Sequence, residues 1–430
     1  MIAEKDSFKA SRTAYIISVA LTYFIQILNG GAYFAKLTTS LGISDGLTAV
    51  LTTFNMLSFV FQLVSIPLAA KSTAKSWVVP FSFLSTASLA FIYLVPTLRI
   101  NKHVALIIVG ALLLSKATIS IVTPLKMNWF FSMVDNSERS VFQAVVSLVS
   151  SITGTVFTLG LGAFYDYFDK NQRLEQAFLF VSVGIFVMAL LDMLLMLLSK
   201  EKPKKNEEKS KIREHVNFLF HDKPFRKMLI LYGLWHCATF VIIPFTGTYQ
   251  IKELGFSLGY VSVITSVTNV FQILVLFALT KVSKRYSNTQ IFGAAWPVAI
   301  AAFFILAVSN RDNGHITYLL YMLLHALYAQ MHTVSYNNMI YDIVPMDKRV
   351  AAFSVVNVVV GIASFLTTLL VSPLYDYVQQ QRIFLFGKEI YAQQIASLVC
   401  TLSVILLSVY YFKRCKKDFD QERTIYSGDV

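Results

Sequence analysis

The sequence contains twelve apolar stretches, each long enough to cross a lipid bilayer. A membrane-spanning α-helix needs about 17–25 predominantly apolar residues. The stretches lie near residues 14–35, 47–69, 77–96, 104–125, 141–164, 177–198, 229–250, 258–280, 290–308, 316–340, 351–374 and 390–412. Lipid offers no partner to an unpaired backbone amide, so all twelve are expected to be helices. Composition agrees, because 56% of the residues are hydrophobic and only 14% are charged. The sequence therefore predicts an all-α polytopic membrane protein.

The distribution of basic residues predicts the orientation of the chain. With the N-terminus in the cytoplasm, 27 of the 37 Lys and Arg residues lie on the cytoplasmic side and nine on the outer side, with Lys116 inside a span. Such a bias follows the positive-inside rule. We expect a protein of the cell membrane with both termini cytoplasmic. The net charge of +13 then reflects topology, and no module for nucleic-acid binding accompanies it.

The two halves of the chain repeat each other. A segment from Ser132 that contains Arg139 and Tyr165-Asp166-Tyr167 aligns without gaps to a segment from Asp342 at a shift of 210 residues. Earlier in each half, LGISDG from Leu41 matches LGFSLG at a shift of 213. The similar shifts indicate a six-helix unit copied once. An even number of spans keeps both copies in the same orientation, so we expect a pseudo-twofold axis along the membrane normal.

The predicted domains follow from this duplication. Residues 1–199 form an N-terminal six-helix bundle, residues 200–225 a charged cytoplasmic linker, and residues 226–430 a C-terminal six-helix bundle with a short tail. The repeated Tyr-Asp-Tyr segments are expected at the outer ends of spans five and eleven, with their rings at the level of the lipid headgroups.

The chain resembles the major facilitator superfamily over its whole length. Twelve spans, both termini inside, a long loop after span six and basic loops after spans two and eight carry the resemblance. The loop after span two keeps Lys71 and Lys75 but has Ala69 and Ala70 where that family has an acid. The resemblance implies a transporter that alternates between inward-open and outward-open states, with a cavity lined by spans one, four, seven and ten.

Those four spans carry polar stripes. In span one, Thr22 and the residues after it recur at the spacing of one helix face. The candidate substrate-binding residues are Tyr23, Gln26, Asn29, Tyr33, Lys116, Ser120, Trp235, His236, Gln250, His325, Tyr328 and His332. The alternative for each is packing, because Ser, Thr, Asn and Gln also form hydrogen bonds between membrane helices. Asn55 and Gln62 on span two are expected to serve in that way.

Two ionisable residues are expected deep in the membrane, Lys116 near its middle and Asp192 in the inner leaflet. Such groups are costly and usually face a cavity or a partner. Lys116 favours an anionic substrate group. The alternative is a structural ion pair between Lys116 and Asp192, and both interpretations remain open at this stage.

Coupling and gating candidates are His325, His332, Asp192, Arg139 and Arg349. Histidine is a candidate for carrying a coupling proton because its unperturbed pKa lies near neutral pH. Arg139 and Arg349 begin spans five and eleven at matching positions. Each guanidinium is expected to bind carbonyls at the end of the preceding helix, or a nearby acid, and to stabilise one closed state. The alternative is simple anchoring by positive charge.

The function predicted from these features is secondary transport of a small polar organic solute, either a sugar or an organic anion, with proton coupling left open. Export of amphiphilic compounds and sensing on a transporter scaffold are the alternatives. An enzyme is not expected, because the sequence has no HExxH, no Walker loop and no paired carboxylates within the spans. We expect no cofactor and no metal site, and a monomer in the lipid bilayer with a small-molecule substrate as its partner.

Overall fold

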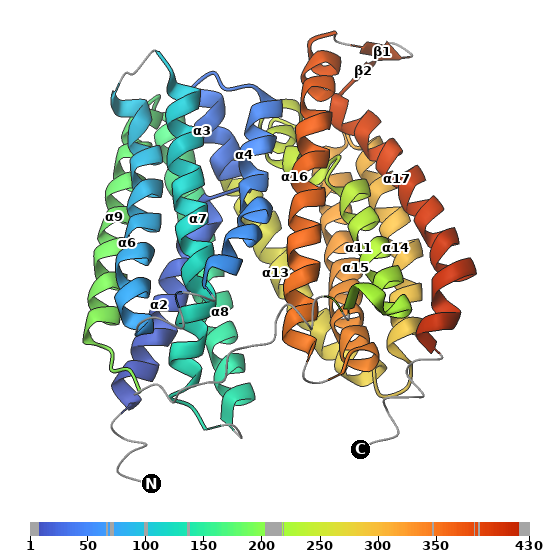
Figure 1. The fold of residues 1–430 in the computed structure, drawn as a ribbon. Coiled ribbons are helices and arrows are strands. Elements are labelled where there is room, and N and C mark those ends of the chain that lie inside the picture. The colour runs from blue at the N-terminus through green and yellow to red at the C-terminus, as the bar shows by residue number, and fades with distance from the viewer. Residues whose placement is uncertain are drawn as a thin grey trace. The chain divides into compact units, whose positions relative to one another are not determined.

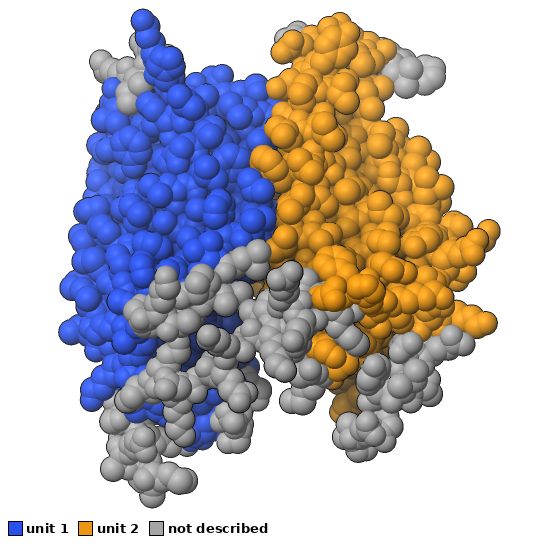
Figure 2. Space-filling model, viewed as in Figure 1, with its two compact units in different colours: residues 1–206, 256–263 blue, residues 207–255, 264–430 orange. Residues whose placement is uncertain are grey.

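The computed structural model describes residues 8–65, 68, 73–98, 102–135, 138–202, 217, 219–345, 348–381, 383–385 and 388–420. The chain divides into unit 1, residues 1–206 and 256–263, and unit 2, residues 207–255 and 264–430 (Figure 2). The predicted domain boundaries at residues 199 and 225 stay a prediction.

Unit 1 is built from helices that run side by side along the bundle (Figure 1). They are α2 (Lys9–Leu28), α3 (Gly31–Ser40), α4 (Asp45–Leu57), the 3₁₀ helix η1 (Ser58–Val64), α6 (Ala74–Leu94), the 3₁₀ helix η2 (Val95–Leu98), α7 (Val104–Phe131), α8 (Arg139–Lys170) and α9 (Leu174–Leu198). Helix α6 packs against both α7 and α9, and α2 packs against α8 and α9.

Unit 2 repeats this plan and adds a short hairpin. Its elements are α11 (Lys223–Thr239), the 3₁₀ helix η4 (Ile243–Phe245), α12 (Thr246–Thr248), the π-helix η5 (Tyr249–Glu253), α13 (Leu258–Val282), α14 (Asn288–Val308), α15 (Gly314–Ile343), α16 (Arg349–Gln381), α17 (Ala392–Tyr410) and the π-helix η7 (Tyr411–Cys415). The first turns of α13 belong to unit 1. Strands β1 (Ile383–Leu385) and β2 (Lys388–Ile390) pair antiparallel between α16 and α17.

The predicted all-helical membrane fold is confirmed. Within the described residues, ten helices are long and apolar enough to span a bilayer. The other two predicted spans are helical as well. One is α4 continued by η1, and the other is α15, which is 30 residues long but carries Tyr, His and Asn along its length.

Two spans that the sequence presents as continuous helices are interrupted. Span one breaks between α2 and α3, where Gly31 adopts a φ of 59°, a conformation that favours glycine. Span seven breaks after Thr239, and Pro244 lies in the 3₁₀ segment that follows. A proline has no backbone N–H and clashes within a helix interior. Polar residues on either side of these breaks therefore do not share one helix face.

The structure repeats between the halves in detail. Helices α8 and α16 begin at Arg139 and Arg349, which are 210 residues apart. Near their other ends, Tyr165 and Tyr375 are buried at 1% and 3% exposure, while Tyr167 and Tyr377 are 66% and 61% exposed. Residues two apart on a helix point to opposite sides, so only one ring of each pair is available to the headgroups. The expectation that both rings anchor at the surface is wrong for the first tyrosine of each pair.

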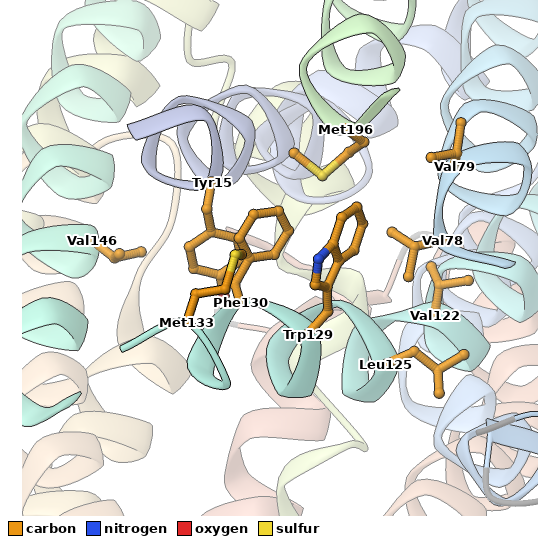
Figure 3. Packing of buried hydrophobic residues seen from close by; sticks show 10 residues of the cluster. All are labelled: Tyr15, Val78, Val79, Val122, Leu125, Trp129, Phe130, Met133, Val146 and Met196. Atoms are coloured by element: carbon orange, nitrogen blue, oxygen red, sulfur yellow. The ribbon is translucent and has the colours of Figure 1, made fainter. Parts of the chain in front are cut away.

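One apolar core of unit 1 joins α2, α6, α7, α8 and α9 (Figure 3). The ring of Tyr15 stacks on Phe130 with centroids 4.4 Å apart, and Trp129 stacks on Phe130 at 4.6 Å. Trp129 Nε1 also donates a hydrogen bond of 2.9 Å to the carbonyl of Lys200. The start of the linker is therefore tied to this core.

An acid from the linker caps α6. Glu201 accepts hydrogen bonds from the backbone N–H groups of Ala74 and Lys75, at 2.7 and 3.1 Å. In return, Lys75 Nζ donates to the carbonyls of Leu197 and Ser199 at the end of α9. A carboxylate is favourable at a helix N-terminus and an ammonium at a C-terminus. Glu201 thus supplies the negative charge that the loop after span two lacks.

Candidate functional site

Lys116 is buried in unit 1, at 5% exposure on α7. Its Nζ donates to Asn55 Oδ1 on α4 over 3.4 Å, which is long for a hydrogen bond. One turn further along α7, Ser120 Oγ donates to Ser58 Oγ at 2.6 Å, and Ser58 donates to the backbone carbonyl of Asn55 at 2.7 Å. Both sets of hydrogen bonds therefore end at Asn55, the first at its side chain and the second at its backbone carbonyl. We name Lys116, Asn55, Ser58 and Ser120 the lysine cluster.

Asp192 is not the partner of Lys116 in the part of the chain that the structure describes. The carboxylate of Asp192 accepts from Ser18 Oγ on α2 and from Lys126 Nζ on α7, the latter at 3.5 Å. Lys126 lies ten residues beyond Lys116, about 15 Å along the helix. That places Lys126, rather than Lys116, at the depth of Asp192. The alternative of a Lys116–Asp192 pair is therefore not what the structure shows.

Lys126 corrects a second expectation. The sequence places it at the cytoplasmic end of span four, yet its side chain is only 10% exposed and that of Asp192 only 8%. Both lie on helices that contribute to the apolar core of Figure 3, Lys126 three residues before Trp129 on α7 and Asp192 four residues before Met196 on α9. Lys126 therefore joins Lys116 and Asp192 among the buried charged residues of unit 1. In the sequence, this pair is indicated only by the position of Asp192 eight residues before Lys200, which places its carboxylate in the inner leaflet, where span four also ends.

The four candidates of span one do not form one stripe. Tyr23, Gln26 and Asn29 lie on or at the end of α2, while Tyr33 lies on α3 beyond the break. Gln26 is exposed, and the buried Oδ1 of Asn29 has no hydrogen-bond partner among the described residues. Tyr33 is 5% exposed, and its hydroxyl donates to the carbonyl of Thr158 at 3.0 Å. Tyr33 therefore packs inside unit 1.

Gln250 is likewise separated from its predicted neighbours. It lies on η5 beyond the break in span seven, is 6% exposed and donates to the hydroxyl of Tyr318 at 2.8 Å. His236 remains on α11, half-buried, with Nδ1 3.1 Å from Ser364 Oγ on α16. These contacts are those of polar groups that join helices within unit 2.

The structure brings the other unit 2 candidates together in an aromatic cluster. Trp235 on α11 stacks on His332 of α15 with centroids 4.5 Å apart, and lies 5.7 Å from the ring of Tyr328. Phe292 of α14 lies 4.4 Å from His332. His325 lies 4.9 Å from Tyr328 and is half-buried, whereas His332 is 4% exposed. The Nε2 of His332 has no hydrogen-bond partner within the described chain.

The two repeated arginines bind helix ends, as the first of the predicted options states. Arg139 Nε donates to the carbonyl of Phe131, the last residue of α7, at 3.3 Å. Arg349 donates to the carbonyls of Val344 and Tyr341, at 3.1 and 2.9 Å, and its guanidinium lies 5.1 Å from the Tyr341 ring. Asp347, the acid closest in sequence to Arg349 and the alternative partner suggested for it, lies outside the described residues. The carbonyls at a helix C-terminus have no partner within the helix, so a cation is favourable there.

Loss of these contacts is expected to slow transport if the arginines act in gating. Arg349→Gln removes two hydrogen bonds and the ring contact, and a hydrogen bond contributes about 0.5–1.5 kcal/mol. We expect a rate decrease of about three- to tenfold, and a smaller one for Arg139→Gln. Lys348→Gln removes the same charge one residue earlier and serves as the control. Equal effects of Lys348→Gln and Arg349→Gln on transport in both directions would support charge anchoring instead.

No metal centre is indicated in the described ranges, because no three His, Cys, Asp or Glu side chains come close enough to hold an ion. Asn55 and Ser58 belong to the site but were not predicted to do so from the sequence. Their polar character was visible, but their position opposite Lys116 depends on how α4 and η1 pack against α7.

Comparisons with known proteins agree with this architecture. A family model described as Major Facilitator Superfamily matches residues 15–368. The fold is similar to the nucleoside transporter NupG, with a TM-score of 0.71 and 12% identity over 94% of this chain and 98% of the other. A D-xylose–proton symporter gives 0.68 and 14% over 94% and 96%. A bacterial homologue of the human lysosomal transporter Spinster gives 0.68 and 13% over 98% of each chain. No curated protein sequence matches the chain.

Proposed function

The chain belongs to the major facilitator superfamily, and on that premise we propose that it is a secondary transporter that moves a small polar organic solute across the cell membrane by alternating access. Solved proteins of similar fold are described as transporters of nucleosides and of D-xylose with protons. Transport rather than catalysis is the activity that this family supports. The solute, its coupling and the cytoplasmic position of both termini are parts of the proposal.

The observation that carries the proposal is the state of Lys116. An ammonium group deep in a membrane protein costs several kcal/mol unless a partner or water compensates for it. Among the described residues, Lys116 has a single neutral acceptor at 3.4 Å, and the carboxylate of Asp192 is bound by Lys126 instead. A site that keeps a buried cation without an acid suits a solute with an anionic or strongly electronegative group.

Flux into proteoliposomes tests this function. The purified protein is reconstituted, and uptake of labelled sugars and organic acids is followed with and without a proton gradient. We expect saturable uptake of at least one small polar solute, absent from protein-free vesicles. Binding without flux in either direction would indicate a sensor. Flux of lipophilic compounds alone would indicate an exporter of amphiphiles.

A further inference from the structure

We propose that the lysine cluster of unit 1 binds the carboxylate of a singly charged organic acid. This inference rests on the proposed transport function and names its substrate class. In the cluster, Lys116 supplies the charge, and Asn55 supplies the second donor. Ser58 and Ser120 hold Asn55 in place.

The geometry of the cluster comes from two facing helices. Lys116 and Ser120 are four residues apart on α7 and so share one face. Opposite them, α4 ends at Leu57 and the chain continues as the 3₁₀ helix η1. The helix end leaves carbonyls without intrahelical partners, and Ser58 donates to one of them, the carbonyl of Asn55. The serine chain therefore fixes the backbone at Asn55. In Figure 1, α4 lies beside α7, in agreement with the packing between them.

The side chain of Asn55 has one hydrogen-bonding group that remains available to a ligand. Its Oδ1 accepts from Lys116, so its Nδ2 is the group that can donate to a ligand. Asn55 is exposed while Lys116 is buried at 5% exposure. A ligand that approaches Asn55 thus meets an amide donor first and the ammonium behind it. A carboxylate has two oxygens and can accept from both groups, whereas a hydroxyl cannot balance the charge.

The charge of the cluster limits the charge of the ligand. One ammonium compensates one negative charge, and the other three members are neutral. A second negative charge would be moved out of water with no partner among these residues, which is unfavourable. The cluster therefore selects monocarboxylates over dicarboxylates and doubly charged phosphate, and over neutral analogues of the same shape.

Binding to the purified full-length protein tests this selectivity. The probes are three monocarboxylates, butyrate, benzoate and gluconate, each matched with a neutral analogue, butyramide, benzamide and glucose, together with succinate and inorganic phosphate. We expect at least one monocarboxylate to bind about tenfold or more tightly than its neutral analogue and than both dianions, as for a hydrogen bond to a charged group. Absence of that preference across all three pairs overturns the inference.

Two substitutions test whether the lysine cluster is responsible for the preference for monocarboxylates. Asn55→Asp places an acid beside Lys116, so it is expected to satisfy the ammonium and weaken monocarboxylate binding by about 10- to 100-fold, with the protein still folded. Lys116→Gln should weaken it by a similar factor and leave the neutral analogue unaffected. Gln62→Glu adds the same charge two turns further along the chain, on η1, and is the control, with binding retained.

Unchanged selectivity in Asn55→Asp would overturn the assignment of the binding site to the lysine cluster. If neutral solutes are transported but no monocarboxylate is preferred, only this inference fails, whereas absence of all flux contradicts the proposed function.

Discussion

Asp192→Asn is expected to lower the free energy of unfolding by about 3–5 kcal/mol, because it leaves the ammonium of Lys126 buried without a counter-charge. Both side chains are almost fully enclosed, and they lie on α7 and α9, two of the helices that form the apolar core of unit 1. The substitution also changes the acceptor of the Ser18 hydroxyl from a carboxylate to an amide. Thermal and denaturant unfolding in detergent measures the change.

A double-mutant cycle separates this ion pair from the one suggested by the sequence. Combining Asp192→Asn with Lys126→Met replaces the pair by groups without charge, and is expected to recover most of the lost stability, since buried pairs are often replaced at little cost. Combining Asp192→Asn with Lys116→Gln should give additive effects, because these residues share no contact in the described structure. Recovery of stability by the Lys116 double variant would show that Lys116 is the true partner.

His325→Gln is expected to abolish uptake against a concentration gradient while exchange of solute across the membrane continues. We propose that His325 carries the coupling proton, since a group that must take up and release a proton has to be accessible, and His325 is half-buried on α15. The aromatic rings next to it, those of Tyr321 and Tyr328, carry no charge at neutral pH. Uphill uptake by the unaltered protein should depend on pH between about 5 and 8.

His332→Gln is the matched control for this prediction. His332 lies on the same helix but is enclosed by the rings of Trp235 and Phe292, so we assign it a packing role. Its substitution is expected to reduce stability and leave uphill uptake intact after correction for the amount of protein. Uphill uptake equal to that of the unaltered protein in His325→Gln and in the double variant would exclude histidine coupling.

The duplication shows how far sequence alone can reach. Arg139 and Arg349 align at a shift of 210 residues, and both begin a helix and donate to carbonyls of the helix before. That contact is local, because it joins residues eight apart in the chain. Local contacts are specified by local sequence, so their prediction requires no knowledge of how distant helices meet.

The candidate site is different in kind. Span lengths, helical structure and the burial of Lys116 follow from the need to satisfy backbone groups and charges in a bilayer, and these requirements can be read from composition and spacing. The identity of the partner of Lys116 cannot be read from composition and spacing. Whether it meets Asn55 or Asp192 depends on which faces of α4, α7 and α9 pack together, and these helices are far apart in the sequence. Similarly, the break at Gly31 moves Tyr33 off the helix face that carries Gln26, because one residue in a left-handed conformation redirects the chain.

The sequence by itself determined a twelve-span transporter with a buried cation. The tertiary structure decided that Lys126 takes the acid and that Lys116 is left with a neutral amide, because helix packing sets the distances between charges and sequence separation does not.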